Sequence, residues 1–486
     1  MPGKINSSGL ALNEPIIIVG AGVGGLTTAL QLHANGFTNV HIFEASSTLS
    51  TLGVGINVQP SAVLILRNLG LLPALEATGV KTGELNFYNR YGHSILSEAR
   101  GLNAGYDIPQ FSIHRGEFQI LLLDAVKERL GDSKIHLNHA LSSFDQQLDD
   151  VGNNIDGHIT AHFIRRRDAA THADIPSMTA SVLIACDGIN STARRILYPD
   201  EGPANFSGRM LWRGCLEREP YLTGSSMVWA GHANQKFIAY PISGASQRKG
   251  TSLVNWIAEL RVRSEDDPDT TPPEKPDWTQ TVPKERFAEE FKSWTFGFLD
   301  TYKLIQDTER VYEFPMCDRD PISRWSFGRL TLLGDAAHPM YPSKSDIIDL
   351  CIMITDQRRF LVGSNGASQA IIDSLNLVQS LLLHRDDVDG ALKAYQDIRL
   401  PATGRIVLAN RANGPDAVMQ VAYERAPNGF DDINDVIPQQ ELDSIGQAYK
   451  AVAGFEKENV NRSAKETNGA AEKLGLTSPK NWVVNK

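Results

Sequence analysis

Three glycines near the N-terminus stand at a spacing that could bind a nucleotide. Gly20, Gly22 and Gly25 follow an apolar run in the stretch PIIIVGAGVGGL. At a strand–turn–helix junction these glycines permit a tight turn, a close approach of the backbone to a pyrophosphate, and close helix–strand packing. Glu44 ends the next apolar run, where a carboxylate can accept hydrogen bonds from ribose hydroxyls. The pattern predicts dinucleotide binding. It does not separate NAD from FAD, and a glycine-rich turn without a ligand is the alternative.

Two later turns place an aspartate beside a glycine at the end of an apolar run. Asp187-Gly188 follows the stretch ASVLIAC, and Gly334-Asp335 follows GRLTLL. Taken alone, each turn is a common junction at which an aspartate caps a helix. Their order and spacing behind the glycine motif make the set more specific than any one member.

The elements that must position these residues are predicted from the periodicity of apolar side chains. Residues 16–19 and 40–43 are β-branched runs typical of buried parallel strands, and a helical pattern between them stops at Gly36. Alternation in SLVNWIAEL and KFIAYPIS predicts antiparallel strands with one buried face. Residues 84–100 have the pattern of a hairpin that joins the same sheet.

With these motifs in this order, the chain resembles the single-component flavoprotein monooxygenases that hydroxylate aromatic rings, the family with the p-hydroxybenzoate hydroxylase fold. The resemblance runs from about residue 14 to about residue 460. It implies an α/β fold with a discontinuous Rossmann-type FAD-binding domain, a second, mostly antiparallel β-sheet substrate domain and a C-terminal helical segment. The expected ranges are 1–82, 108–200 and 314–420 for the FAD domain, 83–107 and 201–313 for the substrate domain, and 421–486 for the C-terminal extension and tail.

The resemblance also implies FAD contacts along the chain. Arg115 in SIHRGE stands where the family places an arginine against FAD, and Gln119 follows one helical turn later. GVGINVQPSAV resembles the loop that runs along the isoalloxazine ring, with Gly55 and Asn57 as its contacts. The alternative for Arg115 is a surface arginine at a helix start. The implied cofactor-binding set is Gly20, Gly22, Gly25, Glu44, Gly55, Asn57, Arg115, Gln119, Asp187, Gly188, Gly334, Asp335, Gly363, Asn365, Gly366 and Ala367.

The segment after Gly334-Asp335 departs from the family pattern. The family runs from a proline turn into a helix start whose N–H groups face the flavin, but here residues 343–362 separate HPMYP from GSNGASQAI. One hypothesis is an elaborated loop, which would have to bury a long apolar run. The other is a translated, retained intron in a eukaryotic gene. Residues 343–345 can be encoded with a GTAAGT donor site and residues 360–362 with a TAG acceptor, and splicing would leave a single Met. We predict the intron.

Two polar residues stand out in the expected substrate sheet. Arg213 is a charge within the apolar stretch LWRGCLE, and Tyr240 ends a strand against a proline. The resemblance implies that Arg213 pairs with a phenolate or carboxylate of the substrate and that Tyr240 hydrogen-bonds it, which makes these two the candidate catalytic residues. The alternative is an edge-strand ion pair and a structural tyrosine. Six of the seven tryptophans lie in residues 201–330, and we expect at least four of them in the core.

The function implied is that of an FAD-dependent monooxygenase acting on a small aromatic substrate of the phenolic, carboxylate or N-heteroaromatic class. NADPH or NADH would be the transient reductant and O2 the oxygen donor, in secondary metabolism or aromatic catabolism. We expect no metal site, nucleophile or triad. An FAD oxidase or another flavin oxidoreductase is one alternative, and an inactive isoform that binds flavin poorly because of residues 343–362 is another.

Composition agrees with an enzyme and argues against other classes. The 486 residues, 42% hydrophobic and 21% charged, suggest two or three domains. A net charge of −10 without a long basic block argues against nucleic acid as a partner. No stretch reaches the about eighteen apolar residues of a membrane span, and the four cysteines are widely spaced. We expect a cytoplasmic monomer or homodimer.

Overall fold

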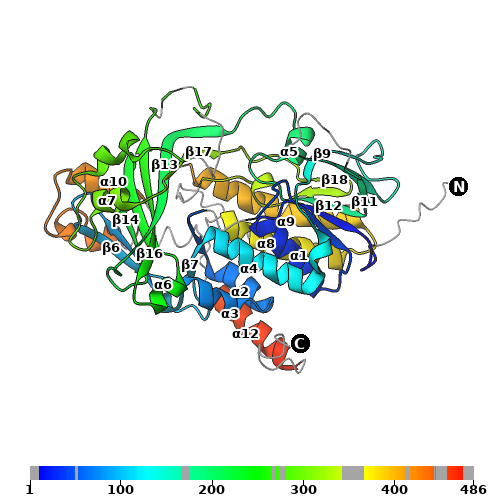
Figure 1. The fold of residues 1–486 in the computed structure, drawn as a ribbon, viewed down its shortest axis with the longest axis horizontal. Coiled ribbons are helices and arrows are strands. Elements are labelled where there is room, and N and C mark those ends of the chain that lie inside the picture. The colour runs from blue at the N-terminus through cyan, green and yellow to red at the C-terminus, as the bar shows by residue number, and fades with distance from the viewer. Residues whose placement is uncertain are drawn as a thin grey trace.

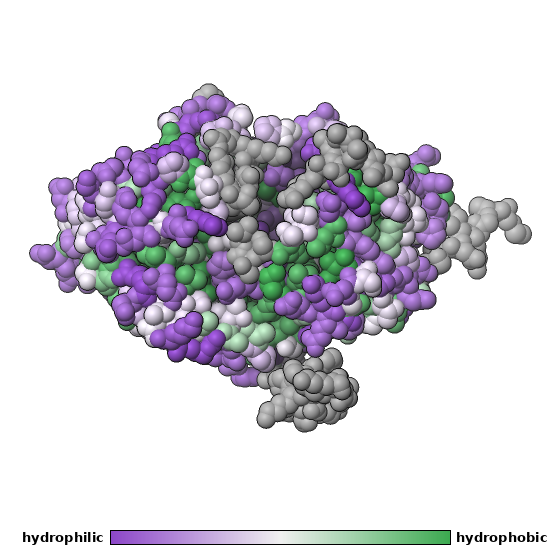
Figure 2. All heavy atoms as spheres, in the orientation of Figure 1, coloured by the Kyte–Doolittle hydropathy of each residue, from purple (hydrophilic) through white to green (hydrophobic). Residues whose placement is uncertain are grey.

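The computed structural model describes residues 10–49, 53–165, 175–264, 266–267, 269–273, 281–341, 366–411, 416–442, 444 and 457–473. These residues form two regions side by side, one built on a parallel sheet covered by long helices and the other on a large, mostly antiparallel sheet (Figure 1). Figure 2 shows hydrophilic residues over most of one face, with hydrophobic residues visible mainly in the middle of the view. Within the described ranges, no helix is long and apolar enough to cross a membrane.

The first region is built on a six-stranded sheet in the order β18-β19-β12-β1-β2-β8. Its strands β1, β2, β8, β12 and β19 are parallel, and the edge strand β18 is antiparallel to β19. Every residue of β1 and β12 is buried, as expected for strands covered on both faces. The bounds are β1 Ile16–Val19, β2 Val40–Phe43, β8 Ile135–His136, β12 Val182–Ala185, β18 Ser326–Phe327 and β19 Leu330–Leu332.

Long helices and a small sheet cover this parallel sheet. Helix α1 packs against both α4 and α8, and α8 packs in turn against α9. A three-stranded sheet in the order β11-β10-β9 contacts β12 through β10. The bounds are α1 Val23–Ala34, α4 Arg115–Leu130, α5 Thr192–Leu197, α8 Gly366–Leu383, α9 Val388–Ala409, β9 Ala140–Asp145, β10 Ile159–Ile164 and β11 Met178–Ala180.

The second region is a seven-stranded sheet in the order β17-β13-β16-β15-β14-β5-β6. All neighbouring strands are antiparallel except β5 and β14. One face packs on α7 and the aromatic residues around it, and part of the other face packs on α10. The bounds are β5 Glu84–Tyr88, β6 Ser94–Ala99, β13 Asn205–Arg218, β14 Ser226–His232, β15 Gln235–Pro241, β16 Ser252–Arg261, β17 Tyr312–Asp318, α7 Thr301–Asp307 and α10 Asp416–Arg425.

A third, smaller sheet joins the two regions. It has the order β3-β7-β4, and α3 packs against α6 of the larger sheet. Helix α12 packs against α2. The bounds are β3 Gly55–Val58, β4 Val80–Lys81, β7 Phe111–His114, α2 Pro60–Asn68, α3 Leu72–Thr78, α6 Gly244–Arg248 and α12 Lys457–Lys473.

The predicted fold class is confirmed, including the strands at 16–19 and 40–43 and the hairpin of β5 and β6. One domain boundary needs correction. We placed residues from 314 onward in the FAD domain, but β17 pairs with β13 in the seven-stranded sheet. A strand's sheet is set by its partner, which sequence order does not reveal. Residues 343–362 lie outside the described residues, so the proposed domain ranges and the intron remain hypotheses.

Candidate active site

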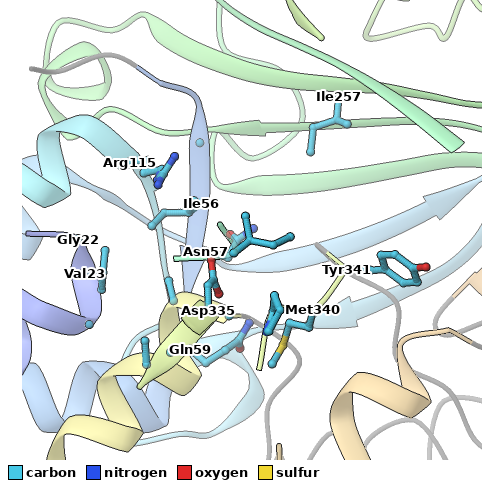
Figure 3. Close-up of a pocket in the computed structure, with 18 of the residues that line it drawn as sticks. Gly22, Val23, Ile56, Asn57, Gln59, Arg115, Ile257, Asp335, Met340 and Tyr341 are labelled. Carbon is cyan, nitrogen blue, oxygen red and sulfur yellow. The ribbon is translucent and has the colours of Figure 1, made fainter. Parts of the chain in front are cut away.

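A cavity of about 330 Å³ lies where the small β3-β7-β4 sheet meets the seven-stranded sheet. In Figure 3, Gly22 and Val23 at the start of α1 lie on one side of it and Tyr341 lies on the other, with Asn57 and Asp335 between them. The cavity therefore runs from the glycine motif of the first region to the sheet of the second.

The three glycines of the motif differ in what surrounds them. Gly20 has a φ of +102°, and a Cβ there would lie 2.4 Å from the carbonyl oxygen of Cys186. A Cβ on Gly25 would lie 2.0 Å from the carbonyl oxygen of Gly20. A Cβ on Gly22 would meet nothing within 4 Å, and Gly22 lines the cavity. Two glycines thus permit the turn and the packing, and the third borders open space at the first turn of a helix, where backbone N–H groups can bind an anion.

Glu44 and Gln119 both hold the glycine turn through Ala21. The Oε2 atom of Glu44 accepts a hydrogen bond from the backbone N–H of Ala21 at 2.8 Å, and its Oε1 atom accepts one from Ser46. The Nε2 atom of Gln119 donates to the carbonyl oxygen of Ala21 at 2.7 Å. The structure thus brings both predicted residues to the motif, where they fix its backbone.

Arg115 and Asp335 lie deep among protein atoms, yet both side chains remain exposed beside the cavity that they line. Burial lowers the pKa of Arg115 and raises that of Asp335, and the two charges oppose these shifts in each other. Asp335 is the one exposed residue within the otherwise buried stretch 330–339. Asn57 lines the same cavity and accepts a hydrogen bond from Ser112. This is the arrangement expected of side chains that contact a ligand.

The two residues of the Asp187-Gly188 turn have different roles. The carboxylate of Asp187 accepts hydrogen bonds from the Ser191 hydroxyl and from the backbone N–H of Thr192, so it caps α5 and does not line the cavity. Burial raises the pKa of Asp187, and these hydrogen bonds oppose the rise. Gly188 does line the cavity, and a Cβ there would meet nothing within 4 Å.

A buried charge network supports the Gly334-Asp335 turn. Asp373 on α8 accepts from the backbone N–H of Gly334 at 3.1 Å, and its carboxylate lies 2.6 Å from both His338 Nε2 and Arg399 Nε. Burial by itself would raise the pKa of Asp373, but His338 and Arg399 outweigh it and lower the pKa to about 2. Our sequence analysis missed Asp373 and Arg399. A lone aspartate in the apolar stretch AIIDSLNL was the available signal.

Arg213 and Tyr240 meet at the backbone of Gly55. Nη2 of Arg213 donates to the Gly55 carbonyl oxygen at 2.7 Å, and the Tyr240 hydroxyl donates to the same oxygen at 2.9 Å. Asn255 accepts from the Gly55 N–H at 2.7 Å. Burial raises the pKa of Tyr240 to about 12, although Arg213 opposes the rise. Tyr240 is therefore a neutral phenol near neutral pH.

The remaining predicted residues are placed as follows. Gly366 and Ala367 begin α8 and line the cavity, whereas Gly363 and Asn365 lie outside the described residues. Of the tryptophans at positions 201–330, Trp278 also lies outside them. Trp229 lines the cavity, and the others are buried in the core: Trp212, Trp256, Trp294 and Trp325. The expectation of a mostly structural tryptophan set is confirmed.

The sequence profile of the family described as FAD binding domain matches residues 13–346. This chain belongs to that family. It is 37% identical over 402 residues to phenazine 1,6-dicarboxylic acid hydroxylase PhzS of Lysobacter antibioticus, an alignment that covers 82% of this chain and 90% of that protein. It is 26% identical to 3-hydroxybenzoate 6-hydroxylase of Polaromonas naphthalenivorans, with 82% and 87% covered. The family and its named relatives identify the chain as an FAD-dependent aromatic monooxygenase.

Solved structures share the fold of this flavoprotein. Klebsiella pneumoniae HpxO, solved with FAD and uric acid, has a TM-score of 0.62 at 18% identity, and the alignment covers 93% of this chain and 96% of that one. The residues of this chain fit FAD by their own geometry. Gly22 leaves room for a pyrophosphate at the first turn of α1, and Arg115 and Asp335 offer polar groups further along the cavity. The flavoprotein therefore has one continuous site that spans both regions.

Proposed function

We propose that this flavoprotein hydroxylates a flat N-heteroaromatic or phenolic acid, with NAD(P)H as reductant and O2 as oxygen donor. The observation that carries the proposal is the continuous cavity, which joins the glycine turn at Gly22 to the pair Arg213 and Tyr240. The 37% identity to a phenazine hydroxylase supports the N-heteroaromatic class.

FAD, once reduced by NAD(P)H, supplies the chemistry that activates O2 and transfers one oxygen atom to an aromatic ring. Gly22, with the first turn of α1, would hold the pyrophosphate. Arg115 and Asp335 would hold polar groups further along the cofactor. The start of α8 at Gly366 and Ala367 would present its N–H groups toward the flavin ring, where negative charge develops on reduction.

Arg213 and Tyr240 are proposed to bind and activate the substrate ring. The Nε atom of Arg213 is buried, and among the described residues it has no hydrogen-bond partner. An anionic oxygen of a phenolate or carboxylate would satisfy it. Tyr240, held neutral, would donate to the same oxygen by turning its one hydroxyl proton away from the Gly55 carbonyl, which Arg213 also holds. Stabilising an oxyanion on the ring keeps the ring electron-rich, which electrophilic oxygen transfer requires.

Apolar side chains of the sheet form the rest of the substrate end of the cavity. Ile238, Ile257 and Phe314 line it on the side of the seven-stranded sheet, and Figure 3 shows Ile257 above the centre of the site. Such a lining suits a flat ring and excludes water from the reacting centre.

The test is oxygen incorporation from isotopically labelled O2. Purified flavoprotein is given NADPH or NADH with a panel of phenolic, benzoic, quinoline and phenazine acids. We expect at least one acid to stimulate NAD(P)H oxidation and to gain one labelled oxygen atom. Stimulated NAD(P)H oxidation that yields only hydrogen peroxide across the panel would instead indicate an oxidase.

We further propose a cytoplasmic protein that acts as a monomer or homodimer. Light scattering after gel filtration gives the oligomeric state, and fractionation of the source cells gives the compartment. A membrane-pelleted protein, or an assembly larger than a dimer, would contradict this proposal.

A further inference from the structure

Part of the cavity wall is formed by the two ends of one surface loop. Arg100 and Gln110 both line the cavity, and we call residues 100–110 the cavity loop. A Cβ added at Gly101 would lie 2.7 Å from the backbone nitrogen of Gln110, so the two ends of this loop are in contact. Leu102, in its outer part, is exposed. The cavity loop therefore reaches from the cavity to the protein surface, as compact surface loops with close ends do.

The cavity loop contacts the wall next to Tyr240 through Met227. The Nε2 atom of Gln110 lies 3.9 Å from the sulfur of Met227 on β14, and Met227 also lines the cavity. Val228 pairs with Ala239 on β15, so Met227 lies beside Tyr240 across these two antiparallel strands. Neighbouring strands are about 4.8 Å apart. A movement of the cavity loop away from Met227 would therefore open the cavity next to Tyr240.

The ends and the outer part of the cavity loop are held by different elements. At its ends, the backbone N–H of Arg100 donates to the carbonyl oxygen of Gly83, and the carbonyl oxygen of Gln110 accepts from Thr82. In its outer part, every hydrogen bond that joins residues 104–107 to another described element comes from α12. The position of the outer part therefore depends on the C-terminal helix.

Asn461 on α12 makes the central contact with the cavity loop. Its Oδ1 atom accepts a hydrogen bond from the backbone N–H of Asp107 at 2.8 Å, and its Nδ2 atom donates to the carbonyl oxygen of Gly105 at 2.9 Å. Lys457, one helical turn earlier, donates to the carbonyl oxygen of Ala104 at 3.4 Å. These contacts lie at the surface, where hydrogen bonds open more readily than in the core, so the loop can be released without unfolding the protein.

The same helix is fixed to α2. Val460 and Ala464 of α12 are buried in the core of the first region. The Nη2 atom of Arg67 on α2 donates to the carbonyl oxygen of Ala464 at 3.2 Å and to the hydroxyl of Thr467 at 2.7 Å. Helix α2 follows β3, the strand that begins at Gly55, and Figure 1 shows α12 at the edge of the molecule next to α2. Helix α12 therefore bridges two elements that bound the same cavity.

We propose that α12 is a strap that holds the cavity loop in place and so controls access to the cavity next to Tyr240. While Asn461 is bonded to the loop, Gln110 stays against Met227 and this side of the cavity is closed to water, as oxygen transfer to a substrate requires. When that contact breaks, the loop moves outward and a ligand can enter. The part of this inference that concerns substrate entry rests on the proposed function, whereas control of the loop by α12 does not.

Amide hydrogen exchange of the FAD-loaded, full-length protein tests the hold of α12 on the loop. Asn461→Ala removes both hydrogen bonds to the loop backbone, so a peptide that covers residues 101–110 should exchange about tenfold faster, while a peptide from β1 and α1 should not change. Arg462→Ala is the matched control. Arg462 is an exposed residue of the same helix whose Nη2 atom bonds to Asn459 within that helix, and its loss should leave exchange in the loop unchanged.

Iodide quenching of flavin fluorescence measures access to the cavity in the same proteins. Asn461→Ala should raise the quenching constant at least twofold. Val460→Asp places a charge on the buried side of α12, so it should release the helix and raise the constant further. Fluorescence anisotropy identifies any FAD that has left the protein, because free FAD rotates faster. The proposal is overturned if loop exchange in Asn461→Ala equals that in Arg462→Ala, or if it rises without a change in quenching of the bound flavin.

The two proposals fail separately, because neither exchange nor quenching requires turnover. If both respond to Asn461→Ala but no acid of the substrate panel is hydroxylated, the strap stands and the proposed function fails. If an acid is hydroxylated but neither measurement responds to Asn461→Ala, the function stands and the strap fails.

Discussion

Arg213 and Tyr240 donate hydrogen bonds to the same acceptor, the backbone carbonyl of Gly55. They come from β13 and β15, and β16 between these strands contributes Asn255 to the N–H of the same glycine. Gly55 admits no side chain, because a Cβ there would lie 2.6 Å from Ile242 and 2.7 Å from Tyr240. The candidate catalytic pair therefore also fixes β3, the strand expected beside the flavin ring.

Tyr240→Phe should lower kcat/KM at least tenfold and the free energy of unfolding by only about 1 kcal/mol, because one buried donor is lost while Arg213 still holds Gly55. Steady-state kinetics and urea unfolding measure the two effects. Tyr221→Phe is the matched control, since Tyr221 is a buried tyrosine of the same region that donates to Ser226 and does not line the cavity. Equal losses of activity in both variants would show that Tyr240 acts only through stability.

Gly25→Ala and Gly22→Ala should fail in different ways. A Cβ added at Gly25 would overlap the Gly20 carbonyl, so we expect a loss of about 3 kcal/mol in stability and little folded protein. Gly22 has a φ of −76° and free space around it, so its variant should keep wild-type stability within about 0.5 kcal/mol. It should nevertheless bind FAD at least tenfold more weakly. Unchanged FAD affinity in Gly22→Ala, measured by fluorescence titration of the apoprotein, would place the pyrophosphate elsewhere.

Asp373→Asn should destabilise the protein by about 3–5 kcal/mol at pH 7, because Arg399 is left buried without its carboxylate. The folded-state pKa of Asp373, about 2, lies below the ordinary value of 3.8. The stabilisation is therefore complete above about pH 4 and is lost as the pH falls through 2. Urea unfolding at several pH values should show the gap between wild type and variant narrowing over this range.

Asp389→Asn is the control for that experiment. Asp389 also pairs with an arginine, Arg329, and accepts a hydrogen bond from the backbone N–H of Asn154, but burial raises its pKa. Its variant should keep FAD and show no such narrowing on acidification. An Asp373→Asn protein that retained full FAD absorbance and stability would contradict a supporting role for the network.

Replacing residues 343–362 with a single Met should raise FAD occupancy, because the proline turn and the start of α8 would again follow one another directly. The match to the family profile ends at residue 346, inside this segment. Absorbance at 450 nm per protein after purification measures occupancy, with both forms also reconstituted in excess FAD. Equal occupancy, or a mature transcript that retains all twenty codons as its main form, would rule out the intron hypothesis.

The sequence by itself determined the local units of the fold. Gly20, Gly25 and the strands beside them were predicted because the sterics of a strand–turn–helix junction act within a few residues. Glu44 was found at the end of such a unit, whereas Arg115 was assigned through the resemblance to the family. The regular alternation of the second region likewise predicted its sheet, although β17 was assigned to the wrong side of a boundary.

The tertiary structure alone decided how distant residues combine. The Gly55 carbonyl meets Arg213 and Tyr240 because strand register brings together positions more than 150 residues apart. Asp373 meets Gly334 and Arg399 because α8 packs on the turn and on α9. Trp229 was one tryptophan among seven in the sequence. Only the folded sheet distinguishes it, by burying its N–H without a partner on the wall of the cavity. Pairing and burial depend on partners that local sequence does not specify, so these relationships could not be predicted from it.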